Sequence, residues 1–203
     1  MLKHGGMLVK KNTLHIKEVV LVVIIAILFG VVYKLWGPVY TLANAIAPFL
    51  AQIVYPMWFV AGVIAAYIIR KPGVAFLAEF LAASGELFAG SQFGLSMLFS
   101  GFMQALGAEL IFLIFRYRNW DLAVLILASV TAAIGSLISN YLFSGLGANT
   151  AFMQVMIISV RIVSSAFVCG FFSKWVADKL AATGSLDSYA IILSTQKARW
   201  EYE

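Results

Sequence analysis

Six apolar runs separated by short polar segments dominate the chain. Their approximate bounds are Glu18–Leu35, Ile53–Ile69, Val74–Ala89, Leu95–Phe115, Leu122–Phe143 and Ala151–Phe172. A helix that crosses a membrane needs about 20 predominantly apolar residues. The third run is the shortest and contains two carboxylates. The pattern predicts an all-α membrane protein with six transmembrane helices.

The segments between and around the runs predict the rest of the organisation. We expect an N-terminal tail over 1–17, a six-helix transmembrane domain over 18–180 and a C-terminal tail over 181–203. The segment "WGPVYTLANAIAPFL" has two prolines and no charge, and it predicts a loop that folds back over the bundle. The first run is longer than the apolar part of a signal peptide and lacks a cleavage site, so we expect it to be retained.

Composition supports a bilayer environment. The chain has 203 residues, of which 63% are hydrophobic and 11% are charged. A soluble domain has roughly 45–50% apolar and about 25% charged residues, and a domain of this size cannot hide such an excess in one core. The single cysteine, Cys169, excludes a disulfide within the chain and is expected to be a packing residue.

The distribution of cations predicts the orientation in the membrane. Twelve of the fourteen lysines and arginines precede the first run, follow the sixth run or fall in alternate loops, and the three opposite loops have none. Cytoplasmic segments carry the excess of lysine and arginine. We therefore expect a multi-pass protein of the cell membrane with both termini in the cytoplasm. We interpret these cations as topology signals, and they form no basic patch that would bind nucleic acid. Membrane lipid is an expected partner of the apolar runs.

Charged groups inside the runs need partners, because a charge at the centre of a bilayer is costly. Glu79 and Arg161 fall at the same depth near the midplane, which predicts an ion pair between them. Glu109 falls in the inner half and is expected to join a network with the basic loops. Glu86 falls in the outer half, where only Lys34 shares its depth.

Polar and aromatic residues gather at the depth of Glu86. They are Trp36, Tyr40, Asn44, Tyr55, Trp58, Gln92, Phe93, Asn140, Tyr141, Asn149 and Gln154. A carboxylate makes charge-assisted hydrogen bonds, and aromatic faces attract cations. The set predicts a site for a small, flat, nitrogen-rich and cationic ligand. The alternative is a polar cap of solvated loop residues and interfacial aromatics.

The sequence gives little support for catalysis, metal binding or nucleotide binding by this chain. Both histidines, His4 and His15, lie in the N-terminal tail, so the runs contain no catalytic histidine pair and no histidine metal cluster. No phosphate-binding glycine loop is present. We expect no catalytic residue, metal or cofactor. Ala26 and Gly30 lie on one face of the first run, where small residues allow another helix to approach closely. That helix could belong to a partner or, as an equally good alternative, to the same bundle.

Several blocks carry a family resemblance. The stretches "FGVVYKLWGPVY", "IIRKPG", "GELFAGSQFG" and "GAELIFLIFRYRNW" resemble the YkoE family, the substrate-binding S components of energy-coupling factor (ECF) transporters. The resemblance covers roughly residues 18–180. It implies six helices with cytoplasmic termini and a vitamin site on the outer side, under a lid that follows the first helix. It also implies partners, namely a transmembrane coupling subunit and ATPase subunits.

The resemblance extends to the ligand and to individual residues. It implies thiamine or its hydroxymethylpyrimidine precursor as the ligand, with Glu86 as a ligand residue and with Glu79 or Glu109 within reach. It implies that Ala26 and Gly30 dock the coupling subunit. The alternatives are a stand-alone transporter or channel for a small organic cation, which usually has internal repeats, and an intramembrane enzyme or scaffold. No convincing internal repeat is present in the sequence.

Overall fold

The computed structural model describes residues 13–193, and every regular element in this range is helical. Within these residues, five helices are long and apolar enough to cross a membrane: Ile16–Ile46, Pro48–Ile69, Ser96–Ile114, Leu122–Phe143 and Ala151–Ala182. The prediction of an all-helical membrane fold is thereby confirmed in its coarse form. The outer parts of the two predicted tails, 1–12 and 194–203, lie outside the described residues.

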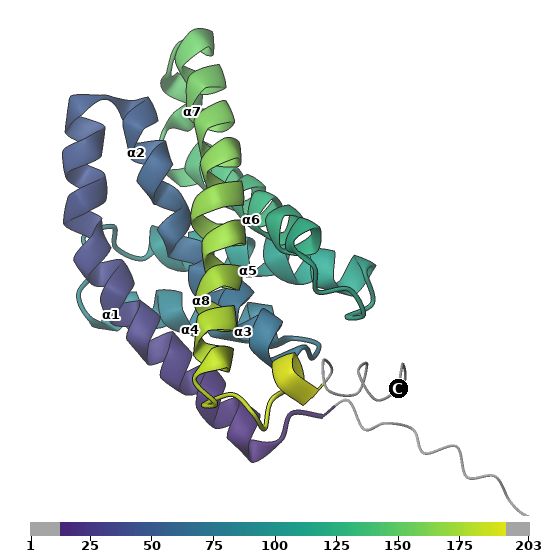
Figure 1. Ribbon diagram of the computed structural model, residues 1–203. Coiled ribbons are helices and arrows are strands. Elements are labelled where there is room, and N and C mark those ends of the chain that lie inside the picture. The colour runs from purple at the N-terminus through teal and green to yellow at the C-terminus, as the bar shows by residue number, and fades with distance from the viewer. Residues whose placement is uncertain (1–12, 194–203) are drawn as a thin grey trace, which may run out of the picture.

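The elements form six helical rods in the described part of the chain (Figure 1). The first is α1 (Ile16–Ile46), the third α4 (Val74–Phe88), the fourth α5 (Ser96–Ile114) and the fifth α6 (Leu122–Phe143). The second joins α2 (Pro48–Val54), the 3₁₀ turn η1 (Tyr55–Phe59) and α3 (Val60–Ile69). After the short η2 (Leu146–Ala148), the sixth joins α7 (Ala151–Ser164), the π-helical η3 (Ser165–Phe171) and α8 (Phe172–Ala182).

The loop predicted after the first run is wrong. Helix α1 continues through Pro38 to Ile46, and the chain reverses at Ala47 into α2. Ala47 precedes Pro48, and the residue before a proline disfavours the helical conformation. The backbone of Ala47 is accordingly extended (φ −160°, ψ 136°). An internal proline such as Pro38 is tolerated in a membrane helix. A helical hairpin, formed by the end of α1 and by α2, therefore occupies the place where a loop was expected (Figure 1).

Helix α4 has 15 residues, which corresponds to about 22 Å. It packs against α1, α3 and α5. Ala26 and Gly30 of α1 face it: a Cβ added to Gly30 would lie 3.1 Å from the Cα of Gly85 and 3.2 Å from the carbonyl oxygen of Ala82. The small-residue face is buried between two helices of the same chain. The docking surface expected at Ala26 and Gly30 is therefore not free for a partner.

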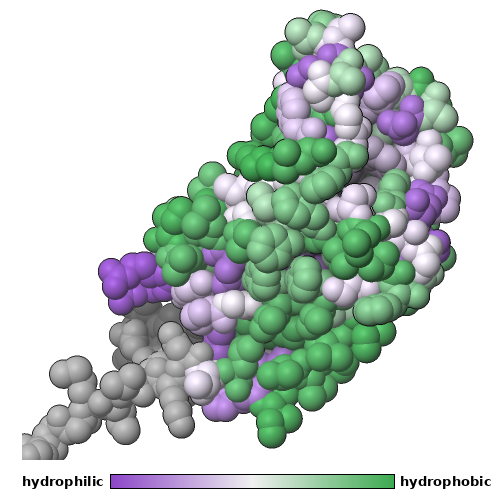
Figure 2. All heavy atoms as spheres, turned by 180° about the vertical axis from the view of Figure 1, so that it is seen from behind, coloured by the Kyte–Doolittle hydropathy of each residue, from purple (hydrophilic) through white to green (hydrophobic). Residues whose placement is uncertain are grey.

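The described start and end of the chain lie at the same end of the bundle. Lys71, in the loop after α3, forms an ion pair of 2.7 Å with Glu18 in the first turn of α1. Lys17 donates to the carbonyl oxygen of Ser188, also at 2.7 Å. Seen from behind, broad hydrophobic areas cover much of the visible face, with polar residues among them at its upper end (Figure 2). These areas fit contact with lipid.

Glu109 joins the two basic loops at this end, as predicted, but through neutral partners. Its Oε1 accepts from the backbone N–H of Gly73 and from the Tyr117 hydroxyl, both at 2.6 Å. Its Oε2 accepts from the N–H of Phe76 at 3.1 Å. Glu109 thus caps the N-terminus of α4, where negative charge is favourable. Burial and the bond to Glu109 raise the pKa of Tyr117.

Candidate functional site

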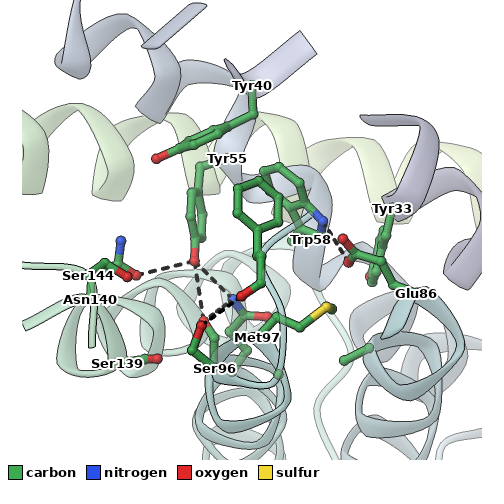
Figure 3. A pocket seen from close by; sticks show the side chains of 15 residues that line it. Tyr33, Tyr40, Tyr55, Trp58, Glu86, Ser96, Met97, Ser139, Asn140 and Ser144 are labelled. Carbon is green, nitrogen blue, oxygen red and sulfur yellow. Dashed lines mark hydrogen bonds between the residues drawn. The ribbon is translucent and has the colours of Figure 1, made fainter. Parts of the chain in front are cut away.

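A pocket of about 300 Å³ lies between α1, η1, α4, α5 and α6. Its volume is at the lower end of the range for ligand sites, so it suits a small ligand. Figure 3 shows Glu86 and Tyr33 on one side and Asn140, Ser139 and Ser144 on the other. The lining residues are Tyr33, Tyr40, Tyr55, Trp58, Ala83, Glu86, Phe93, Ser96, Met97, Ser100, Gly101, Gln104, Ser139, Asn140 and Ser144.

Glu86 is the acidic residue of this lining. It lies in the last turn of α4 and is 1% exposed. One carboxylate oxygen accepts from the indole N–H of Trp58 and the other from the Ser91 hydroxyl, both at 3.0 Å. Lys34 donates to the carbonyl oxygen of Gly90 instead. Within the described residues, no cation forms an ion pair with Glu86.

Four aromatic rings cluster in the pocket, and one of them, Trp58, bonds to this carboxylate. They come from three places: Tyr40 from the upper part of α1, Tyr55 and Trp58 from η1, and Phe93 from the loop between α4 and α5. The Tyr40 ring lies 5.3 Å from Trp58, 5.7 Å from Tyr55 and 5.9 Å from Phe93, each edge to face. Aromatic rings next to a carboxylate form a favourable environment for a flat organic cation.

The opposite wall is polar and uncharged. The Tyr55 hydroxyl lies 3.3 Å from the Ser100 hydroxyl and donates to the Asn140 side-chain oxygen at 3.4 Å. Gln104 donates to the Tyr55 hydroxyl at 3.5 Å and to Ser100 at 3.1 Å. Most of these bonds are longer than the usual 2.7–3.2 Å. A ligand with a ring nitrogen or an amino group can replace them with shorter ones.

Six of the residues predicted for the site line the pocket: Tyr40, Tyr55, Trp58, Glu86, Phe93 and Asn140. They converge because α1 extends further than expected and because η1 turns the second rod toward the end of α4. The predicted level in the membrane therefore corresponds to a hollow with these side chains around it.

The other predicted residues lie outside the lining. Trp36 donates to the carbonyl oxygen of Val54 at 2.9 Å, between α1 and α2. Gln92 donates to the Thr41 hydroxyl at 2.8 Å and holds the α4–α5 loop against α1.

Tyr141 and Gln154 bond to each other at 2.6 Å near the C-terminal end of α6. Tyr141 is 44% exposed. Each of these side chains is engaged by another part of the protein.

Glu79 lies beneath the pocket and does not meet Arg161. Its Oε2 accepts from the Tyr33 hydroxyl and from the N–H of Gly62, both at 3.0 Å. Its Oε1 is buried and has no hydrogen-bond partner in the described structure. The predicted ion pair is wrong, because equal depth does not place two side chains on facing sides of their helices. Tyr33 lines the pocket and connects Glu79 to it.

Arg161 of α7 binds neutral groups instead. Its Nε donates to the side-chain oxygen of Gln52 at 2.8 Å, its Nη2 also donates to that oxygen, and its Nη1 donates to Ser136 at 3.0 Å. Its Cζ lies 3.6 Å from the ring centroid of Tyr55. Gln52 of α2 and the η1 turn therefore occupy the positions that an acidic partner would need.

Sequence reasoning missed the contribution of α5. Ser96, Ser100 and Gln104 follow one another at intervals of four residues and all line the pocket. Residues four apart share one face of a helix, so a polar stripe on this apolar helix was a readable signal. Tyr33 carried no comparable signal, because its neighbours in the sequence do not predict which way it points.

Comparisons with known proteins agree with this geometry. A family model described as an ABC-type cobalt transport system, permease component, matches residues 17–135. The chain is 37% identical over 187 residues to YkoE of Bacillus subtilis (strain 168), named as an HMP/thiamine permease protein; the match covers 91% of this chain and 93% of that protein.

A solved structure gives the same result for the fold. The crystal structure of an S-component of an ECF transporter superposes with a TM-score of 0.89 at 34% identity, covering 94% of this chain and 97% of that one. The long apolar helices, the pocket at the end of α4 and these matches lead to one assignment. The chain belongs to the YkoE family of S components, the substrate-binding membrane subunits of ECF transporters.

Proposed function

We propose that this subunit captures thiamine, or its hydroxymethylpyrimidine precursor, and delivers it across the membrane. The observation that carries the proposal is the buried Glu86 carboxylate, which accepts from Trp58 in a pocket with four clustered aromatic rings and forms no ion pair with a described cation. Burying an unpaired charge costs free energy. A positively charged ligand in the pocket recovers part of that cost.

Thiamine has the chemical groups that the two walls require. Its thiazolium ring is a flat cation, which suits the carboxylate of Glu86 and the ring of Trp58. Its aminopyrimidine has ring nitrogens and an amino group, which suit the hydroxyl and amide groups of Tyr55, Ser100 and Gln104. The relative from Bacillus subtilis is named for the same two compounds, which supports this choice.

A metal cargo fits the described residues less well. The matched family description names cobalt transport. No three histidine, cysteine, aspartate or glutamate side chains in the described range gather as a metal-binding group. The lining of the pocket instead offers a single carboxylate, aromatic rings and neutral polar groups.

The proposed topology has six spans, with the pocket open toward the outside. The helix α4 is the sixth span, in addition to the five long helices. It has 15 residues and packs against α1, α3 and α5. The basic loops gather with both described chain ends at the opposite end of the bundle from Glu86. The positive-inside rule supports placing that end in the cytoplasm. There the coupling subunit and the ATPase subunits would use ATP to drive release.

Binding by the purified chain tests the proposal. Thiamine, hydroxymethylpyrimidine and choline are titrated by calorimetry, with choline as a cation that has no aromatic ring. We expect saturable one-to-one binding of thiamine and much weaker binding of choline, which has the positive charge but no aminopyrimidine to bond with Tyr55, Ser100 and Gln104. Native mass spectrometry of the untreated chain identifies any compound that co-purifies. Failure of both thiamine and hydroxymethylpyrimidine to bind would overturn the proposal.

The division of work between subunits needs a second measurement. Liposomes containing the chain alone are expected to bind thiamine without concentrating it. Liposomes containing the complex with its coupling and ATPase subunits are expected to accumulate thiamine only when ATP is supplied. Accumulation by the chain alone, driven by an ion gradient, would favour a stand-alone transporter.

A further inference from the structure

Arg161 is a buried cation that has no acidic partner in the described range 13–193. It is 0% exposed, and its hydrogen bonds go to the neutral side chains of Gln52 and Ser136. Across the described residues, no carboxylate forms an ion pair with it. A charge buried in this way costs several kcal/mol, and packing alone would be served by an apolar side chain. The position therefore points to a use for the charge itself.

The contact with Tyr55 connects this charge to the pocket. The guanidinium carbon lies 3.6 Å from the centroid of the Tyr55 ring, over its face. Tyr55 lines the pocket, whereas Arg161 does not. The aromatic ring of Tyr55 thus stands between the guanidinium and the ligand space.

The charge makes the Tyr55 wall unfavourable for a second cation. A cation on the open face of the ring, within about 6 Å of the centroid, would lie within roughly 10 Å of the guanidinium in a medium of low dielectric constant. The same field draws electron density from the Tyr55 hydroxyl and makes it a stronger hydrogen-bond donor. This wall is therefore suited to a neutral group that accepts hydrogen bonds.

The opposite side has the reverse preference. Glu86 and Tyr33 lie on the far side of the pocket from Asn140, Ser139 and Ser144 (Figure 3). Between the two sides, Tyr55 is bonded to Asn140 and Trp58 to Glu86, with their ring centroids 5.4 Å apart. The carboxylate of Glu86 favours positive charge beside Trp58. The pocket is consequently polarised from one wall to the other by two charges of opposite sign, only one of which lines it.

We propose that Arg161 is a specificity-determining residue that acts through Tyr55 and fixes the orientation of the ligand. The cationic ring of the ligand lies at Trp58 and Glu86. The neutral nitrogen heterocycle lies at Tyr55, accepts from its hydroxyl and bonds to Gln104 and Asn140. The inference rests on the proposed function, because it assumes a ligand with one cationic and one neutral ring.

The test compares two halves of the ligand. Hydroxymethylpyrimidine supplies the neutral ring. An N-methylated thiazolium with the methyl and hydroxyethyl groups of thiamine, the thiazolium alcohol, supplies the cationic ring. Dissociation constants for both, and for thiamine, are measured by calorimetry on the wild-type chain, Arg161→Gln and Arg161→Lys. Glutamine removes the charge but keeps a polar group that can bond to Gln52 and Ser136. Lysine keeps the charge.

We expect Arg161→Gln to weaken the binding of hydroxymethylpyrimidine at least fivefold and to leave the binding of the thiazolium alcohol unchanged or tighter, so that the ratio of the two dissociation constants changes at least fivefold. Arg161→Lys should keep the wild-type ratio. A purely structural role would weaken both compounds alike. A ratio within twofold of wild type in folded Arg161→Gln would overturn the inference, even with thiamine binding intact.

A second variant decides the matter if Arg161→Gln does not fold. Tyr55→Phe keeps the ring and the guanidinium contact but removes the hydroxyl, and it should weaken only hydroxymethylpyrimidine. Equal effects on both compounds, or none, would overturn the inference. Wild-type protein that binds neither thiamine nor either half would overturn the proposed function and the inference together.

Discussion

Replacing Glu86 by glutamine removes one charge from the pocket at nearly constant shape. In the native protein the two carboxylate oxygens accept from Trp58 and from Ser91, each at 3.0 Å. The oxygen of glutamine can still accept from Trp58, and its NH₂ group can donate to the Ser91 hydroxyl, which accepts as well as donates. Glu86→Gln therefore removes the attraction to a cation while both neighbours keep a hydrogen-bond partner.

The expected loss follows from the strength of charged interactions. Two unit charges 4 Å apart interact with about 4 kcal/mol at an effective dielectric constant of 20, and desolvation offsets part of this. Hydrogen bonds to charged groups contribute about 1.5–3 kcal/mol net. We expect a loss of binding free energy in this range for thiamine, which corresponds to a dissociation constant that is roughly ten to a hundred times larger. Hydroxymethylpyrimidine, which is neutral, should lose less.

The assay is calorimetric titration of purified Glu86→Gln, with folding checked by thermal unfolding in detergent. Glu109→Gln is the matched control, because it also neutralises an acid of the bundle, a partly buried one that caps the start of α4 outside the pocket. The control should unfold at a lower temperature and bind thiamine within twofold of wild type. A folded Glu86→Gln protein that binds thiamine as tightly as wild type would refute the reasoning.

Two further predictions concern packing and the loop between α4 and α5. Gly135→Ala should destabilise the bundle by about 1–3 kcal/mol, because its Cβ would lie 2.3 Å from the carbonyl oxygen of Met103; an unchanged unfolding temperature would contradict this. Gln92→Ala should speed thiamine dissociation severalfold, since it removes the 2.8 Å bond to Thr41 that ties this loop to α1. Stopped-flow tryptophan fluorescence measures that rate, and an equal rate in the variant would count against a closing role.

Much of the fold was predictable because a bilayer limits the choices. Backbone groups in hydrocarbon must bond within their own helix, so apolar runs translate directly into helices. Leu122–Phe143 was predicted with the bounds that α6 has. The rise of 1.5 Å per residue also turns residue number into depth. Depth was enough to single out Glu86, which the structure places in the lining of a pocket.

Depth along an axis says nothing about rotation around it, and only the tertiary structure decided that. Glu79 and Arg161 share a level, yet they turn to Tyr33 and to Tyr55. Gly30 faces α4 rather than the outside. The amino-acid sequence by itself determined the membrane class, the helices and the acid at the level of the site. Which side chains meet there depended on how six helices rotate and pack, because each contact joins residues far apart in the chain.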